Sequence, residues 1–239
     1  FGRRTGALAA VVLATAHGYF MEARWAHTDM LLACLISVAC LALSQAYRSG
    51  GATGWLLVFY LAIGLANLTK GPLGIVLPIL ALLVFLAGSR DLAFLRRAGL
   101  AWGLPLALAP MGAWLAAYRL SSGEAYPLGF AMERLTIRFT EGLHHTRPFF
   151  HLFTSLSLEF LPWTLFLPAA LWHTFPRPGS RSDRENAYVY SWVIVVLAVF
   201  GLSAERRGVY LLPLLPLLAL LVGRLWDAAL MDWDPPPVD

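Results

Sequence analysis

Long apolar runs separated by short polar segments dominate the chain, and no run alternates between apolar and polar residues. A helix rises about 1.5 Å per residue and the hydrocarbon core of a bilayer is about 30 Å thick, so about 20 apolar residues form one span. Only helices and closed barrels satisfy the backbone in lipid, and barrel strands alternate in polarity. The pattern therefore predicts an all-α bundle of about eight transmembrane helices. The expected helices cover approximately residues 5–21, 30–46, 55–68, 72–87, 98–118, 149–172, 187–202 and 209–226.

The third and fourth runs meet at a charged residue followed by a helix breaker. As a single helix, residues 55–87 would be about 50 Å long, which is too long for one span. Lys70 lies in the middle of this stretch, and the Gly71-Pro72 pair that follows it is typical of a turn. We predict two short spans joined at Lys70, with a re-entrant pair as the alternative.

The composition agrees with a membrane protein. Of the 239 residues, 59% are hydrophobic and only 13% are charged, against about 25% charged in a soluble domain. The mean hydropathy is +0.65. These values exclude disordered chains, collagen, disulfide scaffolds and ordinary soluble globules. The net charge of +4 indicates a phosphate-bearing membrane or substrate rather than nucleic acid.

The distribution of basic residues predicts the orientation. With eight spans both chain ends lie on one side, which then holds ten of the 18 Lys and Arg residues. The positive-inside rule makes this side cytoplasmic, and places the long connection over about residues 119–148 outside. We expect a membrane domain over residues 1–226 and a disordered acidic tail over residues 227–239.

Candidate chemistry lies on the predicted external side, beginning with residues 22–29. An Asp such as Asp29 can act as a base, orient a basic residue, or simply cap the second helix, and spacing alone favours the cap. Lys70 at a span end either extends towards lipid head groups or binds a phosphate with its compact charge.

The external connection carries a second group of candidates. Arg138 and Arg147 are suited to binding a phosphate through their guanidinium groups. His145 is included as a substrate-binding candidate because histidines bind metals and move protons, although a structural or interfacial role fits a lone His better. The adjacent histidines do not have the ligand spacing of a zinc site, so we assign no metal ligands.

A third group precedes the last span. Arg206 and Arg207 stand at its entrance, and Tyr210 follows within one turn. These residues are substrate-binding candidates, with membrane anchoring by the two arginines as the alternative. The sequence contains no glycine-rich phosphate loop, no Ser/His/Asp order and no metalloprotease motif.

Taken in order, these segments resemble a family of polytopic glycosyltransferases, the bacterial relatives of dolichyl-phosphate-mannose protein mannosyltransferases. This group includes the aminoarabinose transferase that modifies lipid A. The matching segments span about four-fifths of the chain and are residues 22–29, 64–72, 138–149 and 203–216.

The resemblance implies a GT-C fold and a transferase that moves a sugar from a polyprenyl-phosphate donor to a protein or lipid acceptor. It implies a multi-pass protein of the bacterial inner membrane with its active face in the periplasm. Asp29 resembles an active-site acid of the family, whereas Lys70, Arg138 and the Arg206-Arg207 pair resemble positions that face the polar cavity. A divalent metal is compatible with this chemistry, although the sequence shows no complete metal site.

In this family, the external loop after the first span carries an acidic residue needed for catalysis, and that loop would precede Phe1. We therefore expect the chain to be N-terminally incomplete and inactive in isolation. Two other functions stay open, a transporter or flippase for an anionic lipid and a non-catalytic membrane assembly subunit. A transporter should carry ionisable residues near the midplane, and Glu159 is the main such residue in the predicted spans.

Overall fold

The computed structural model describes residues 2–25, 27–129, 133, 136–137, 148, 150–176, 181–204 and 207–233. The regular elements in these residues are helical, as the apolar runs predicted. They are α1 (Arg3–Thr15), α2 (His17–Ala23), α3 (Thr28–Arg48), α4 (Thr53–Lys70), α5 (Leu73–Gly88), η1 (Leu92–Arg96), α6 (Leu100–Ser122), α8 (His151–Glu159), η2 (Trp163–Phe166), α9 (Leu167–Thr174), α10 (Arg181–Leu202), η3 (Gly208–Leu214) and α11 (Leu215–Trp233).

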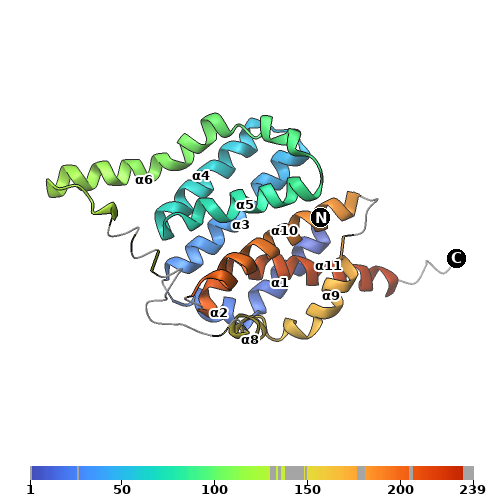
Figure 1. The fold of residues 1–239 in the computed structure, drawn as a ribbon. Coiled ribbons are helices and arrows are strands. Elements are labelled where there is room, and N and C mark those ends of the chain that lie inside the picture. The colour runs from blue at the N-terminus through green and yellow to red at the C-terminus, as the bar shows by residue number, and fades with distance from the viewer. Residues whose placement is uncertain are drawn as a thin grey trace.

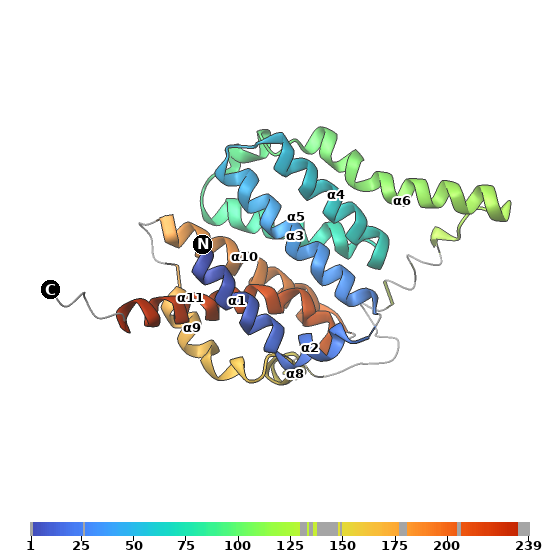
Figure 2. The same cartoon turned by 180° about the vertical axis from the view of Figure 1, so that it is seen from behind.

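The helices form two layers (Figures 1 and 2). One layer contains α3, α4, α5 and α6, and the other contains α1, α9, α10 and α11. The layers meet where α5 packs against α10 and where α3 packs against η3. Trp192 of α10 and Leu77 of α5 are fully buried in the core. Helix α6 contacts mainly α4 and extends away from the rest of the bundle.

Five helices in the described residues are long and apolar enough to cross a membrane, and seven if each of two bent pairs forms one span. Helix α5 is apolar but shorter. Each of the eight runs therefore corresponds to a helix or a bent pair, while the count of eight spans stays a prediction. Helix α6 continues to Ser122, so the connection expected over residues 119–148 begins later, at Gly123.

The break predicted at Lys70 is confirmed. Helix α4 ends at Lys70, and Gly71 has φ +71° and ψ −153°, a conformation that disfavours side chains. The chain then folds back so closely that a Cβ on Gly74 would lie 2.3 Å from the backbone nitrogen of Asn67. Two glycines thus allow α4 and α5 to form a tight hairpin, with Lys70 at its turn.

Small residues also let other helices approach closely. A Cβ on Gly223 of α11 would lie 2.9 Å from the backbone of α1 at Ala9, and one on Gly64 of α4 would lie 2.6 Å from the Ala107 carbonyl of α6. Packing through small residues is typical of helices in membranes, where lipid is as apolar as the side chains.

The C-terminal boundary differs from the expectation of a tail beginning at Asp227. Helix α11 continues to Trp233, and Asp227 is bound within the fold. Its Oδ2 accepts a hydrogen bond from Thr5 at 2.5 Å, and its Oδ1 lies 3.4 Å from Arg4 Nε. The acidic residue therefore joins the two chain ends. Residues 234–239 lie outside the described range.

The first and sixth runs were expected to form unbroken helices, and both are bent. Helices α1 and α2 meet at 70°, and α8 meets the η2–α9 segment at 111°. Two hydrogen bonds connect the bends. The His17 N–H donates to the Leu161 carbonyl at 2.8 Å, and Trp163 Nε1 donates to Thr15 Oγ1 at 2.9 Å. A backbone N–H at the first bend and a backbone carbonyl at the second, which lack helical partners, thus satisfy each other.

Glu159 lies at the end of α8, beside this junction. Its carboxylate occupies the space above two glycines: a Cβ on Gly18 would lie 1.7 Å from Oε2, and one on Gly208 would lie 2.8 Å from Oε1. Glu159 therefore connects α8 with α2 and with the start of η3, at a helix break.

Adding a methyl group at Gly18 should test this contact. We expect Gly18→Ala to lower the free energy of unfolding by about 1–3 kcal/mol, because the new Cβ also lies 2.9 Å from the Cβ of Glu159. Combining it with Glu159→Ala, which removes the carboxylate but keeps the Cβ, should recover part of that loss. Thermal unfolding of the purified protein provides the measurement, with Gly6→Ala on α1, where a Cβ meets nothing within 4 Å, as the control. Equal melting temperatures for Gly18→Ala and Gly6→Ala would contradict the contact.

Candidate functional site

A charged pair joins the end of α4 to the beginning of α3. Lys70 is the last residue of α4, and Asp29 lies in the first turn of α3. These helices are consecutive and pack against each other, which brings the two residues together although 41 positions separate them. Lys70 Nζ lies 2.5 Å from Asp29 Oδ1, and the side chains are 26% and 15% exposed. The pair is thus partly shielded but still reachable from outside.

The capping interpretation of Asp29 does not agree with the structure. The N-cap of α3 is His27, and it makes no side-chain capping hydrogen bond. The Asp29 carboxylate instead accepts a hydrogen bond from Lys70. A negative charge in the first turn also interacts favourably with the positive end of the helix dipole. Asp29 therefore orients a basic residue, one of the roles considered from the sequence.

Tyr210 of η3 completes this group. The Lys70 ammonium lies 5.4 Å from the centroid of the Tyr210 ring, a distance at which a cation is attracted to the π face. The Tyr210 ring stacks on Phe200 of α10, with 5.3 Å between centroids and 26° between planes. Three residues predicted from separate segments are therefore brought together, and the aromatic stack fixes one side of the ammonium.

The other predicted residues are placed less completely. Arg207 immediately precedes η3, and its side chain is exposed. Four candidates lie outside the described residues, so their roles stay predictions: Arg138, His145, Arg147 and Arg206.

Sequence reasoning singled out the segment before α3 but did not predict how its side chains pair. His27 Nδ1 lies 2.9 Å from Glu22 Oε2, and its ring lies 6.4 Å from that of Trp25 with nearly parallel planes. The Arg24 guanidinium lies over the Phe20 ring at 5.9 Å. The pairs that His27 forms with Glu22 and Trp25 depend on the path of the chain between α2 and α3, for which residue spacing gives no signal. Phe20 and Arg24, in contrast, are four residues apart, which is the spacing of neighbours on a helix.

This geometry suits the recognition of an anion. A Lys ammonium is a compact charge that binds phosphate well, and here it is held in place before a ligand arrives. Within the part of the chain that the structure describes, no group of three or more His, Cys, Asp or Glu side chains is placed to hold a metal ion.

Comparison with known sequences agrees with this chemistry. The profile of the dolichyl-phosphate-mannose-protein mannosyltransferase family matches residues 1–117, which include Asp29 and Lys70. Two relatives are named undecaprenyl phosphate-alpha-4-amino-4-deoxy-L-arabinose arabinosyl transferase. The one from Pseudomonas fluorescens is 31% identical over 72% of this chain and 29% of its own length. The one from Erwinia tasmaniensis is 28% identical over 92% of this chain and 40% of its own length.

Two crystal structures share the fold. ArnT from Cupriavidus metallidurans bound to undecaprenyl phosphate has a TM-score of 0.79 and 26% identity, covering 98% of this chain and 44% of that chain. The apo form of that protein has a TM-score of 0.77. The fold is thus that of a multi-pass membrane glycosyltransferase of the GT-C class.

Within that class, the chain belongs to the aminoarabinose transferase family, as its ordered segments indicated. The chain covers only 29% to 44% of the length of the relatives and solved structures described above.

Proposed function

We propose that this protein transfers a sugar from a polyprenyl-phosphate donor to an acceptor at the membrane surface. The observation that carries the proposal is the Lys70–Asp29 pair beside Tyr210, in a chain that aligns over 98% of its length with ArnT bound to undecaprenyl phosphate. The names of the curated relatives support undecaprenyl phosphate as the lipid carrier and 4-amino-4-deoxy-L-arabinose as the sugar.

The pair suggests a division of roles. An acceptor oxygen attacks the anomeric carbon, and the bond between that carbon and the phosphate oxygen breaks with its electron pair remaining on the phosphate. Lys70 stabilises the negative charge that develops there, and this is the kind of electrostatic effect that dominates catalysis. Asp29, released from Lys70, accepts the proton lost by the acceptor. Arg138, His145, Arg147, Arg206 and Arg207 are proposed to bind the same substrate.

We place the active face on the periplasmic side of the bacterial inner membrane, with a protein or a lipid as the acceptor. The excess of basic residues at the opposite end of the helices supports this orientation. A polyprenyl tail would stay in the bilayer while its phosphate reaches the helix ends that carry Lys70. The transport alternative gains no support from the comparisons, because the matching relatives are named as arabinosyl transferases and the matching structures are of ArnT.

Mass analysis of the acceptor should test the proposed function. The protein, expressed from its own gene in bacterial membranes, is supplied with undecaprenyl-phosphate-linked aminoarabinose, and acceptor molecules should gain the mass of one sugar residue. Asp29→Asn and Arg138→Ala should each reduce this product by about 10²-fold or more at equal expression.

Two results would contradict this proposal. Movement of the donor across proteoliposomes without a covalent product would favour a transporter. Near-normal transfer by both variants would show that the reaction does not depend on Asp29 or Arg138.

A further inference from the structure

A second charged cavity lies at the opposite end of α3 from Asp29. Arg48, which lines it, is 19 residues further along the same helix, or about 28 Å at 1.5 Å per residue. The hydrocarbon core of a bilayer is about 30 Å thick. The cavity and the Lys70–Asp29 pair are therefore spaced to lie at the two opposite membrane interfaces.

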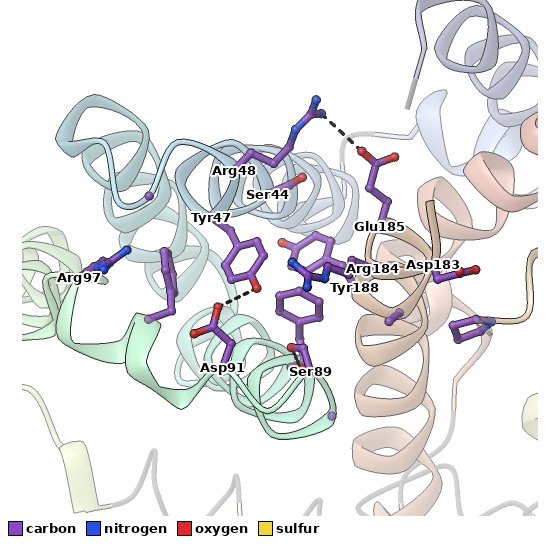
Figure 3. A pocket seen from close by; sticks show the side chains of 16 residues that line it. Ser44, Tyr47, Arg48, Ser89, Asp91, Arg97, Asp183, Arg184, Glu185 and Tyr188 are labelled. Atoms are coloured by element: carbon purple, nitrogen blue, oxygen red, sulfur yellow. Dashed lines mark hydrogen bonds and ion pairs between the residues drawn. The ribbon is translucent and has the colours of Figure 1, made fainter. Parts of the chain in front are cut away.

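The cavity has a volume of about 850 Å³ and is formed by the ends of α3 and α5, by η1 and by the first turns of α10 (Figure 3). Its wall is aromatic. The Tyr47 ring lies 4.9 Å from Phe85 and 5.0 Å from Phe94, and Phe85 lies 5.2 Å from Tyr188, each pair in an edge-to-face arrangement. These four rings come from four different elements, so the wall is held by the fold rather than by a single loop.

Two of the acidic residues that line the cavity already have partners. Glu185 Oε1 lies 3.8 Å from Arg48 Nη1, and Asp91 accepts a hydrogen bond from the Tyr47 hydroxyl at 2.9 Å (Figure 3). A third acid, Asp183, also interacts with a neighbour. The carboxylates of Glu185 and Asp91 are therefore engaged with groups of the protein itself.

Two arginines that line the cavity differ from these acids in their pairing. Arg97 and Arg184 both line it, and among the described residues neither forms an ion pair with a carboxylate. Figure 3 shows Arg184 extending from α10 towards Tyr47 and Tyr188. Guanidinium groups bind phosphate oxygens through charge-assisted hydrogen bonds, so each of these two arginines can bind an anionic group. The cavity as a whole is lined by three arginines and three carboxylates, so its formal charge is balanced.

We propose that this cavity binds the phosphodiester head group of an anionic phospholipid, in the leaflet opposite the one bordered by Lys70 and Asp29. Its location at a helix end places it at the depth of lipid head groups, where arginine side chains attract anionic lipid. The aromatic wall provides an apolar surface for the glycerol and the first acyl carbons, which a free phosphate ion would not use. Arg184 binds the phosphate on the α10 side of the cavity, and Arg97, which lies on the opposite side beyond Tyr47 and Asp91, adds a second positive charge (Figure 3).

Native mass spectrometry from nanodiscs tests this proposal. The purified protein is placed in discs with equal amounts of phosphatidylglycerol and phosphatidylcholine, and it should retain phosphatidylglycerol selectively. At about 1 kcal/mol for each basic residue near anionic lipid, Arg97→Gln combined with Arg184→Gln should reduce this retention about thirtyfold. A matched pair, Arg24→Gln with Arg119→Gln, removes the same charge elsewhere and should leave it unchanged.

Three results would overturn the proposal. The first is equal retention of the two lipids, and the second is an equal loss in both double variants. The third is displacement of the bound lipid by millimolar inorganic phosphate, which would show a site for a free anion. Should the Gln pair fail to fold, Arg97→Lys with Arg184→Lys keeps both charges, and it must then retain selectivity for phosphatidylglycerol over phosphatidylcholine.

Discussion

Replacing Lys70 with methionine is expected to lower sugar transfer by about 10²–10³-fold, the usual cost of removing one group that stabilises charge in a transition state. The physical reason is that the Lys70 ammonium is already positioned by Asp29 at 2.5 Å and by the Tyr210 ring at 5.4 Å, so its removal takes away a charge that is in place before the donor binds. The measurement is the initial rate of transfer from the polyprenyl-phosphate donor, using protein expressed from its own gene.

Two further variants separate catalysis from folding. Tyr210→Phe keeps the aromatic face and should retain most activity, whereas Lys70→Arg keeps the charge but changes its shape and should retain only part. If Asp29 and Lys70 act as a unit, the double variant Asp29→Asn with Lys70→Met should be hardly slower than the slower single variant. Multiplication of the two single effects would show that the residues act independently.

The sequence predicted most of the helices because each depends on a local pattern. The apolar runs are long, and the break at Lys70 follows from Gly71 and Pro72, which are adjacent in the chain. The GT-C class was also recognised correctly, but from four ordered segments rather than from the apolar pattern. A helix bundle in a membrane can have many arrangements with the same hydrophobic runs.

Features that depend on distant partners were not predictable. The bend between α1 and α2 has no proline to mark it, and it depends on the Leu161 carbonyl far along the chain. Asp227 looked like the start of an acidic tail because its partner, Thr5, is 222 residues away. In both cases a polar group is satisfied by a segment that no local pattern links to it.

In the candidate site, too, local patterns identified residues but not their distant partners. Spacing alone favoured Asp29 as a helix cap, and only the antiparallel packing of α3 and α4 gives it Lys70 as a partner. The basic residues at the opposite end entered the sequence analysis only as a count, and the orientation derived from it stays a prediction. Their distribution between paired Arg48 and the cavity-lining Arg97 and Arg184 required the side chains in three dimensions.

The second large effect is expected at Gly74, which touches no substrate in our proposal. A Cβ there would lie 2.3 Å from the Ala66 carbonyl carbon and from the Asn67 nitrogen, both backbone atoms that cannot rotate away. Gly74→Ala must therefore open the α4–α5 hairpin and displace Lys70 at its turn. A displacement of about 1 Å in a positioned group can cost about 10²-fold in rate, so we expect a loss of that order in sugar transfer.

Stability should fall together with activity in this variant. Overpacking costs about 1–3 kcal/mol, against a gain of about 1 kcal/mol from replacing glycine in a helix. The matched control is Gly112→Ala in α6, where a Cβ meets nothing within 4 Å, so only the favourable helix term remains. Thermal unfolding and initial rates of transfer, measured on both variants, show whether overpacking at Gly74 lowers stability and activity. A Gly74→Ala protein as stable and active as Gly112→Ala would show that the close approach of the hairpin does not position Lys70.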